Sequence, residues 1–163
     1  MSQHSPTPDI RPDGISLAPR AVSASASEQA HIVTVGNMNG ANRLFGGLLF
    51  SWMDETAGVT ARRHAGTHVT TAAVEQMRYL APVFRNQIIM VQARVTYTGR
   101  TSLEVLTIAE REEFDGSREL VADARFIFVA LDEDGNTVPV PPLRIDTPEQ
   151  QALFDDAVER RRK

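Results

Sequence analysis

The stretch that most constrains the fold of this chain is residues 47–64, which contain no proline. Apolar side chains recur there every three or four positions, a spacing that predicts one long helix with a broad apolar face. The members of that face are Leu48, Leu49, Trp52, Met53, Ala57 and Ala61. A helix with so much apolar surface is expected at the centre of a core, with the rest of the chain packed around it.

The start of this helix has unusual chemistry. Gly46 and Gly47 stand where the first unpaired backbone N–H groups of the helix are expected. Because glycine has no side chain, another atom can approach these donors closely, and a helix N-terminus carries partial positive charge that stabilises an oxyanion. Further along, Asp54 and Glu55 interrupt the apolar run. Burying an acid is costly, so an acid in a core-facing helix is expected to have a specific role.

The remaining sequence predicts a single α+β domain around that helix. Strand-like runs joined by turn signals indicate an antiparallel, strongly curved sheet whose concave face packs on the helix. The expected strands are residues 31–36, 67–80, 87–98, 102–114 and 118–131. A C-terminal helix is expected over residues 148–162, with Thr147 as its cap and Pro148 in its first turn. Residues 1–28, rich in Ser, Pro and Ala, are expected to form a disordered or loosely draped tail, which leaves 29–163 as the domain.

Composition excludes several classes of function. A formal net charge of -4 gives no footprint for nucleic-acid binding. Since there are no cysteines, thiolate nucleophiles and zinc–thiolate sites are excluded, and the spacing of His31, His64 and His68 matches no metal site, so surface or strand-end positions are expected for them. No apolar run approaches the length of about 18 residues that spans a membrane, and no secretory signal is present, so a cytoplasmic protein is expected.

An ordered set of motifs resembles the hotdog-fold acyl-CoA hydrolases, the family of cytosolic acyl-CoA thioesterases. The matching segments are residues 39–47, 52–58, 69–74, 80–83, 99–102, 126–132 and 138–141. Asn42 departs from the family, which usually has glycine there, and Arg43 is bulkier than the usual residue, although asparagine tolerates the left-handed backbone that glycine supplies. The resemblance implies a hotdog fold: a long central helix wrapped by a curved antiparallel sheet of five or six strands, plus a C-terminal helix.

By this resemblance the chain hydrolyses acyl-CoA thioesters to a carboxylic acid and CoA, without a cofactor, because CoA is part of the substrate. Asn39 and Asp54 match the motif asparagine and aspartate of the active site. Asp54 would act as general base, or as nucleophile through an anhydride, while Asn39 would hold water or polarise the carbonyl. The Gly47 N–H would stabilise the oxyanion. Residues expected to contact CoA are Gly46, Arg100, Thr101 and Ser102.

The spacing of Gly47 and Asp54 bears on the assembly. They are seven residues apart, so they lie two helical turns, or about 10 Å, apart along the axis. Within one subunit they cannot both touch one thioester carbon. The resemblance resolves this, because hotdog sites lie between two subunits, and it implies a homodimer at least and a homohexamer built as a trimer of dimers.

Simpler interpretations stand beside these. Asp54 could be a structural carboxylate paired with Arg62 or Arg63, Asn39 a turn residue, the glycine pair a helix start, and residues 100–102 a tight turn. Two other functions are open on the same fold. An enoyl-CoA hydratase or dehydratase would usually place a histidine by the helix, yet no histidine occurs from residue 32 to residue 63. A non-catalytic acyl-CoA-binding module would normally be attached to an output domain, and the first 28 residues are too short for one.

Overall fold

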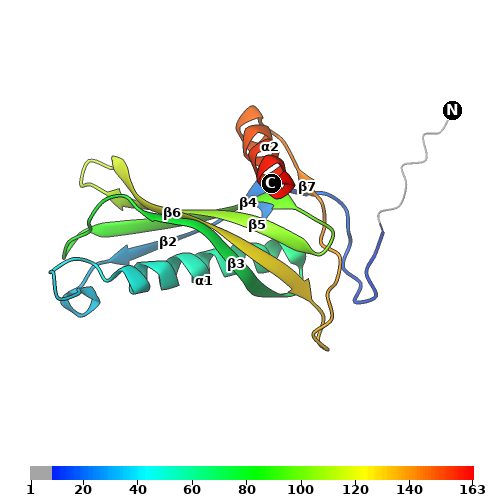
Figure 1. Ribbon diagram of the computed structural model, residues 1–163, viewed down its shortest axis with the longest axis horizontal. Helices are drawn as coiled ribbons and strands as arrows, with labels where there is room; N and C mark the ends of the chain where they lie inside the picture. The colour runs from blue at the N-terminus through cyan, green and yellow to red at the C-terminus, as the bar shows by residue number, and fades with distance from the viewer. Residues whose placement is uncertain (1–8) are drawn as a thin grey trace.

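The computed structural model describes residues 9–163, and the predicted tail over residues 1–8, with His4, lies outside them. A five-stranded antiparallel sheet of order β2-β4-β5-β6-β3 curves around one long helix, α1, on its concave face (Figure 1). The helix is α1 (Gly46–Ala65), and the strands are β2 (Ser27–Ile32), β3 (His68–Tyr79), β4 (Ile88–Thr98), β5 (Ser102–Glu112) and β6 (Arg118–Leu131). The predicted α+β architecture is confirmed, and so is the hotdog arrangement.

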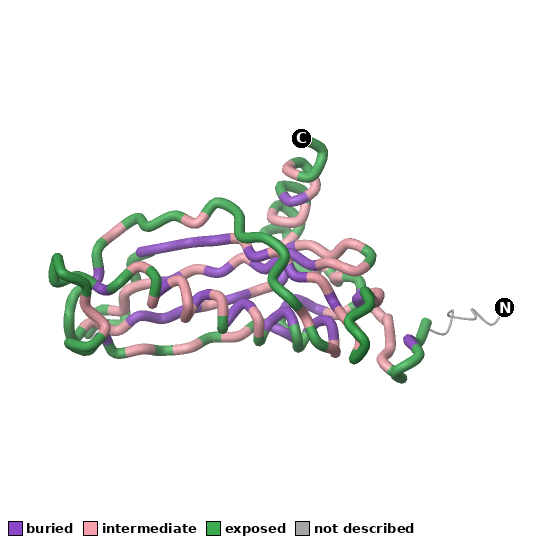
Figure 2. Tube along the Cα trace, turned by 60° about the horizontal axis from the view of Figure 1, so that its bottom comes forward, coloured by how far each residue is buried: buried purple, intermediate pink, exposed green. Residues whose placement is uncertain are grey.

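Small side chains on the inner face of α1 let it pack close to the sheet. Met53, Ala57 and Ala61 are completely buried, and the strands face them with side chains such as Val105 and Phe126. Figure 2 shows the buried residues running through the middle of the molecule, with the loops at both ends exposed. The predicted span of 47–64 is therefore correct apart from one further residue at each end.

The predicted first strand over residues 31–36 is wrong in position. The observed strand, β2, ends at Ile32, where it pairs with the first residue of β4, Ile88. Beyond that point a short 3₁₀ helix, η2 (Val35–Asn37), replaces the strand, because the Asn37 side-chain oxygen accepts hydrogen bonds from both the backbone N–H and the hydroxyl of Thr34. Such local side-chain bonds compete with a sheet ladder.

Residues 9–28, part of the segment predicted as a disordered or loosely draped tail, contain short elements that contact the rest of the domain. β1 (Arg20–Ala21) pairs in parallel with β7 (Leu143–Arg144), and the short helix η1 (Val22–Ala24) buries Val22. The side chain of Arg11 is almost completely buried. It donates to the carbonyl oxygens of residues 65 and 66 at 3.0 and 3.2 Å, so the segment is held by the C-terminal end of α1.

His64 is buried, so its predicted surface position is wrong. Its Nε2 lies 2.9 Å from the carbonyl oxygen of Pro141, and its Nδ1 lies 3.4 Å from the hydroxyl of Ser25. The carbonyl can only accept, so Nε2 donates and Nδ1 accepts from the serine. Burial lowers the pKa of His64, although the Pro141 carbonyl opposes the shift, so the fold favours the neutral ring.

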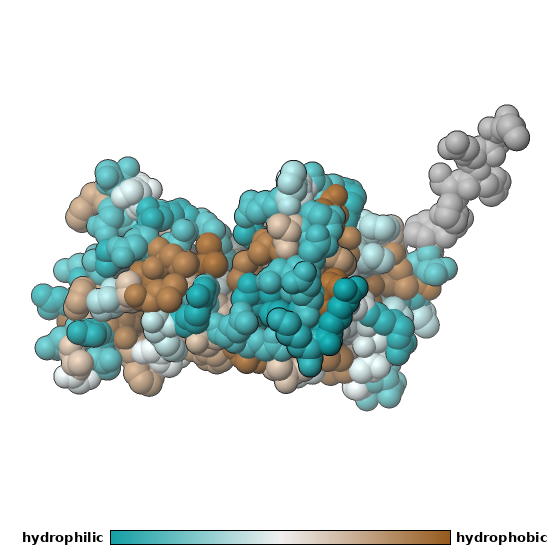
Figure 3. Space-filling model, turned by 45° about the horizontal axis from the view of Figure 1, so that its top comes forward, coloured by the Kyte–Doolittle hydropathy of each residue, from teal (hydrophilic) through white to brown (hydrophobic). Residues whose placement is uncertain are grey.

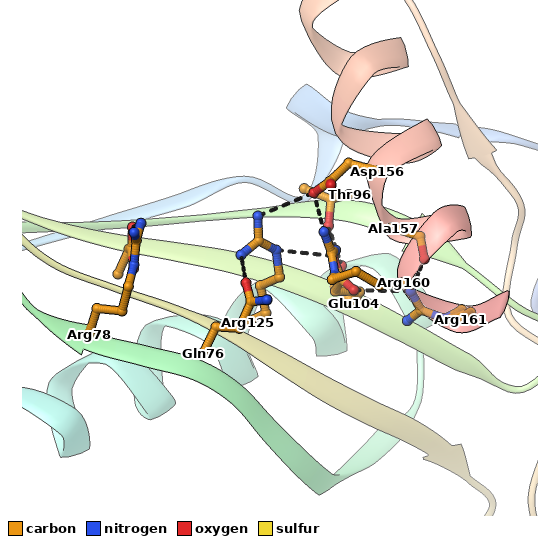
Figure 4. A network of polar contacts seen from close by, with 10 residues as sticks. Gln76, Arg78, Thr96, Glu104, Arg125, Asp156, Ala157, Arg160 and Arg161 are labelled. Atoms are coloured by element: carbon orange, nitrogen blue, oxygen red, sulfur yellow. Dashed lines mark hydrogen bonds and ion pairs between the residues drawn. The ribbon is translucent and has the colours of Figure 1, made fainter. Parts of the chain in front are cut away.

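The C-terminal helix α2 (Pro148–Arg162) matches its predicted span and cap, with the Thr147 hydroxyl accepting from the Gln150 N–H. It stands on the outer, convex side of the sheet, opposite α1 (Figure 1). Figure 4 shows what holds it: the completely buried carboxylate of Glu104 meets the guanidinium groups of Arg160 and Arg161 at 2.7 and 3.0 Å. Because a buried charge needs such partners, these contacts fix α2 to the convex face of the sheet.

Candidate functional site

The loop before α1 is a turn organised by Asn39. Its backbone N–H donates to the Arg43 carbonyl at 2.8 Å, and its Oδ1 accepts from the N–H groups of Ala41 and Arg43 at 2.9 and 3.2 Å. Two backbone donors therefore fix which end of the amide is the oxygen. Within residues 9–163 the amide N–H₂ of Asn39 makes no hydrogen bond, so it remains a donor. Asn42 takes the left-handed backbone, φ 56°, as expected for its departure from glycine.

The first turn of α1 has no side-chain cap. Phe45 occupies the N-cap position, where serine or aspartate would normally accept from the first N–H groups. Its carbonyl accepts from the N–H groups of Leu48 and Leu49 at 3.0 and 3.1 Å. In the described chain the N–H groups of Gly46 and Gly47 donate to no protein acceptor. The helix N-terminus thus presents two unused donors next to the Asn39 turn.

Asn39 lines two hollows at the start of α1. The larger, of about 690 Å³, includes Gly47 and Ser51 in its lining, and the smaller, of about 370 Å³, includes Gly46 and Tyr79. The structure thus brings together three of the residues predicted for the site: Asn39, Gly46 and Gly47.

Asp54 lies two turns further along α1 and lines neither hollow. Its Oδ1 accepts from the hydroxyl of Thr71 on β3 at 3.3 Å. Across residues 9–163 Asp54 makes no ion pair, and Arg63 instead donates to the carbonyl of Ala26. The structural alternative, a pair with Arg62 or Arg63, is therefore not formed. Sequence reasoning missed Thr71, although it lies in one of the motifs that carry the family resemblance.

The strand that carries Thr71 is exposed along most of its length. β3 is an edge strand of 12 residues, and only Val69 and Met77 are partly buried. Its backbone pairs with β6 alone, so the other edge is open. A long open edge is usually covered by another chain, because its N–H and C=O groups are ready to pair.

Arg100, Thr101 and Ser102 lie at the opposite end of the sheet from the glycine pair. The turn is tight, with the Gly99 N–H donating to the Ser102 carbonyl at 2.8 Å. Ser102 pairs with Val129 close to the start of β3, which directly follows the C-terminal end of α1. One chain therefore does not bring this turn to the Asn39 hollows.

Two kinds of feature are absent from residues 9–163. No group of three or more His, Asp or Glu side chains is placed to hold a metal ion. None of the helices described is long and apolar enough to cross a membrane.

Comparison with known sequences relates this chain to thioesterases. The thioesterase superfamily model matches residues 41–113. An uncharacterized acyl-CoA thioester hydrolase of Bacillus subtilis is 37% identical over 123 residues, which cover 75% of this chain and 72% of the relative. The human cytosolic acyl coenzyme A thioester hydrolase is 28% identical over 151 residues, covering 91% of this chain and 40% of the longer human protein.

Solved structures agree. An acyl-CoA hydrolase from Staphylococcus aureus, solved with butyryl coenzyme A and coenzyme A, has a TM-score of 0.82 and 31% identity and covers 88% of this chain and 90% of its own. A hexameric acyl-CoA thioesterase has a TM-score of 0.85 and 29% identity, covering 89% of this chain and 94% of its own.

Three single-residue variants of the Staphylococcus aureus enzyme have also been solved. Structures exist in which one asparagine, one aspartate and one threonine are each replaced by alanine, and in chain order these positions are 15 and then 17 residues apart. In this chain Asn39, Asp54 and Thr71 have the same order and the same spacings.

Proposed function

The chain belongs to the acyl-CoA thioester hydrolases of the thioesterase superfamily, and we propose that Asn39, Asp54 and the Gly47 backbone N–H are its catalytic groups. It is an enzyme that hydrolyses acyl-CoA thioesters to a carboxylic acid and CoA. The observation that carries the assignment of roles is the set of unused donors beside one hollow, the Asn39 amide and the Gly47 N–H, in a helix that carries one half-buried acid.

The donors act on the thioester oxygen. Because the Asn39 oxygen is already bonded in its turn, the side chain can only donate toward a ligand, which favours polarising the carbonyl over accepting from water. The Gly47 N–H, with the helix dipole behind it, is the second donor for the oxyanion. Together they stabilise the negative charge that develops on the oxygen when the carbonyl carbon is attacked.

Asp54 supplies the base or the nucleophile. As base, its carboxylate takes a proton from water while the water oxygen bonds to the carbonyl carbon, and the carbon–sulfur bond then breaks to release CoA as thiolate. As nucleophile, its carboxylate oxygen attacks the carbonyl carbon and the carbon–sulfur bond breaks to release CoA as thiolate. Water then cleaves the resulting anhydride, which returns the free carboxylate and releases the carboxylic acid. In both routes the Thr71 hydroxyl holds the carboxylate in one orientation.

Each site is proposed to combine two subunits. Asp54 and Gly47 are about 10 Å apart along α1, so Asp54 of one subunit would face Asn39 and Gly47 of its partner. The open edge of β3, next to Asp54 and Thr71, supports a dimer formed through that side. Arg100, Thr101 and Ser102, distant from the hollows in one chain, would reach CoA from another subunit, and a guanidinium with two hydroxyls suits a phosphate.

A larger assembly, a trimer of dimers, is the further proposal. The outer face of the sheet carries a hydrophobic patch beside α2 (Figure 3), with Leu106 and Ile108 lining a hollow of about 340 Å³ there. Exposed patches of this kind often mark protein interfaces. A related acyl-CoA thioesterase is hexameric, which supports the same state here. The human relative is named cytosolic, which supports a cytosolic location for this chain.

Subunit complementation tests the shared site. Asp54→Asn and Asn39→Ala oligomers should each be nearly inactive, the second by a factor on the order of 10², the cost of one oxyanion donor. When the two exchange subunits, each mixed dimer holds one site with both lesions and one with neither. Random pairing makes half of the dimers mixed, so activity should recover to roughly a quarter of wild type.

A site built within one subunit predicts the opposite result. If both residues served one subunit's site, every site in the mixture would carry a lesion and no activity would return. Exchange must be shown independently, for example by mass-tagging one variant. With exchange shown, a flat result would reject the shared site, and near wild-type turnover of Asp54→Asn alone would remove Asp54 from the mechanism.

A further inference from the structure

The hydroxyl of Tyr79 makes one contact at the start of α1. It donates to the carbonyl oxygen of Gly46, the first residue of α1, at 2.9 Å. Tyr79 is the last residue of β3, and the chain after it stays on the sheet, because the Leu80 N–H donates to the Val121 carbonyl at 2.8 Å. The hydroxyl is thus presented from the end of β3 to the first peptide of the helix.

That peptide is the one that matters for catalysis. The carbonyl of Gly46 and the N–H of Gly47 belong to the same planar amide, so whatever fixes one fixes the other. A hydrogen bond donated to an amide oxygen also draws electron density toward it and makes the N–H of the same amide a stronger donor. We propose that Tyr79 is a positioning residue, which orients and polarises the Gly47 N–H for the oxyanion. This inference rests on the proposed function.

Two features of the surroundings suit this role. A Cβ on Gly46 would lie 3.3 Å from the Tyr79 ring, so the absence of a side chain at Gly46 lets the ring lie against the peptide. Partial burial raises the pKa of the Tyr79 hydroxyl above its usual value, so the hydroxyl stays protonated and remains a donor at physiological pH. The proposal rests on the hydrogen bond from Tyr79 to Gly46 and on the close packing of the ring. The raised pKa of the Tyr79 hydroxyl means that it remains a donor at the pH at which the enzyme works.

The test is a double-substitution cycle on the peptide and on the hydroxyl. Gly47→Pro removes the N–H in the first helical turn, where proline is tolerated, and Gly47→Ala is its control for added bulk, which the nearby Phe45 ring must accommodate in both variants. Tyr79→Phe removes only the hydroxyl, and Tyr97→Phe, whose ring packs on Phe154, is the matched control. Because the chain has no cysteine, a thiol reagent reports released CoA without background.

The expected pattern is specific. Gly47→Pro should lower kcat by on the order of 10² relative to Gly47→Ala. Tyr79→Phe should lower kcat by about three- to ten-fold with KM little changed, while Tyr97→Phe leaves both alone. In the Gly47→Pro background, Tyr79→Phe should cost nothing further, because the N–H on which it acts is gone.

The possible failures are distinguishable. If Gly47→Pro is as active as Gly47→Ala, the oxyanion assignment fails and the role of Tyr79 fails with it. If Gly47→Pro is slow but Tyr79→Phe leaves kcat unchanged, or lowers it equally in both backgrounds, the Tyr79 proposal is overturned while the assignment of Gly47 stands.

A spectroscopic measurement covers the case in which Gly47→Pro does not fold. Labelling glycine with ¹⁵N gives at most 10 glycine amide signals, and the one from Gly47 is identified by its loss in Gly47→Ala. Tyr79→Phe should move that signal more than the signals of glycines far from the site, such as Gly135. An unmoved Gly47 signal would overturn the proposal.

Discussion

At its C-terminal end, α1 has its last carbonyls bonded to side chains brought from elsewhere. Arg11 donates to the carbonyls of residues 65 and 66, Arg20 to those of residues 63 and 64 at 2.8 Å, and Gly66 ends the helix in the left-handed conformation, φ 66°. At its N-terminal end the same helix has no side-chain cap, and the N–H groups of Gly46 and Gly47 donate to no group among residues 9–163.

This difference separates stability from function. Capping interactions stabilise a helix end, so the arginines at the C-terminal end contribute to folding. An uncapped N-terminus gives up that stabilisation and keeps its donors for a ligand. Substitutions at the start of α1 should therefore change turnover and leave stability nearly intact, and substitutions at its end should do the reverse.

The largest effect is expected at the start of the helix, with Asn39→Asp. Aspartate keeps the side-chain oxygen that accepts from Ala41 and Arg43, so the turn should hold, but it replaces the amide donor with a second oxygen. Turnover should fall by on the order of 10² or more, with the midpoint of unfolding nearly unchanged. An active Asn39→Asp enzyme would mean that the side chain is needed only for the turn.

At the other end, Arg11→Ala should destabilise the protein by about 3 kcal/mol, because a buried guanidinium leaves and buried carbonyls lose their donors. Denaturant unfolding measures this loss, while kcat at a temperature where the variant is folded should match wild type. Arg62→Ala, exposed in the same last turn, is the control and should change the free energy of unfolding by less than about 0.5 kcal/mol. A loss of turnover in folded Arg11→Ala would contradict the separation of the two ends.

The same comparison shows what the sequence could and could not predict. The span of α1 was predictable because the helix buries one regular face, and much of β4, β5 and β6 likewise alternates between a packed and an outer side. The role of Arg11 was not, since its partner, Ala65, is 54 residues away and nothing near Arg11 in the chain signals it. The Tyr79 hydroxyl and Thr71 were missed for the same reason: each contact joins β3 to α1, and periodicity carries no information about which polar atoms meet.

His64, which is buried near the C-terminal end of α1, should make the free energy of unfolding depend on pH. Burial lowers its pKa below the usual 6.5, so below that pH the unfolded chain binds a proton that the folded chain does not. Stability is therefore fully present above pH 6.5 and falls as the pH drops below it, by at most about 1.4 kcal/mol per pH unit for one proton. His64→Gln, which keeps a donor for the Pro141 carbonyl, should flatten this slope in unfolding measured at several pH values.

Part of the slope should remain in His64→Gln, because burial also lowers the pKa of His31, whose ring stacks on Trp52 at 4.0 Å between centroids. Adding His31→Gln should remove most of what is left. An unchanged slope in the double variant would assign the pH dependence to groups other than these two rings.

The smallest effects are expected from Gly58 inside α1 and Gly66 directly after it, which should respond to alanine with opposite sign. Gly66 has a left-handed backbone, and a Cβ there would lie 3.1 Å from the Ile15 side chain, so Gly66→Ala should cost about 1–2 kcal/mol. Gly58 lies in the helix interior, and a Cβ there would meet nothing within 4 Å, so Gly58→Ala should stabilise by about 0.5–1 kcal/mol. Thermal unfolding of the two variants measures both changes in stability. Because the gain at Gly58 assumes open space, a loss there would mean that a partner subunit covers this face of α1, whereas a neutral result at Gly66 would mean that the arginine caps, and not the backbone turn, determine where the helix ends.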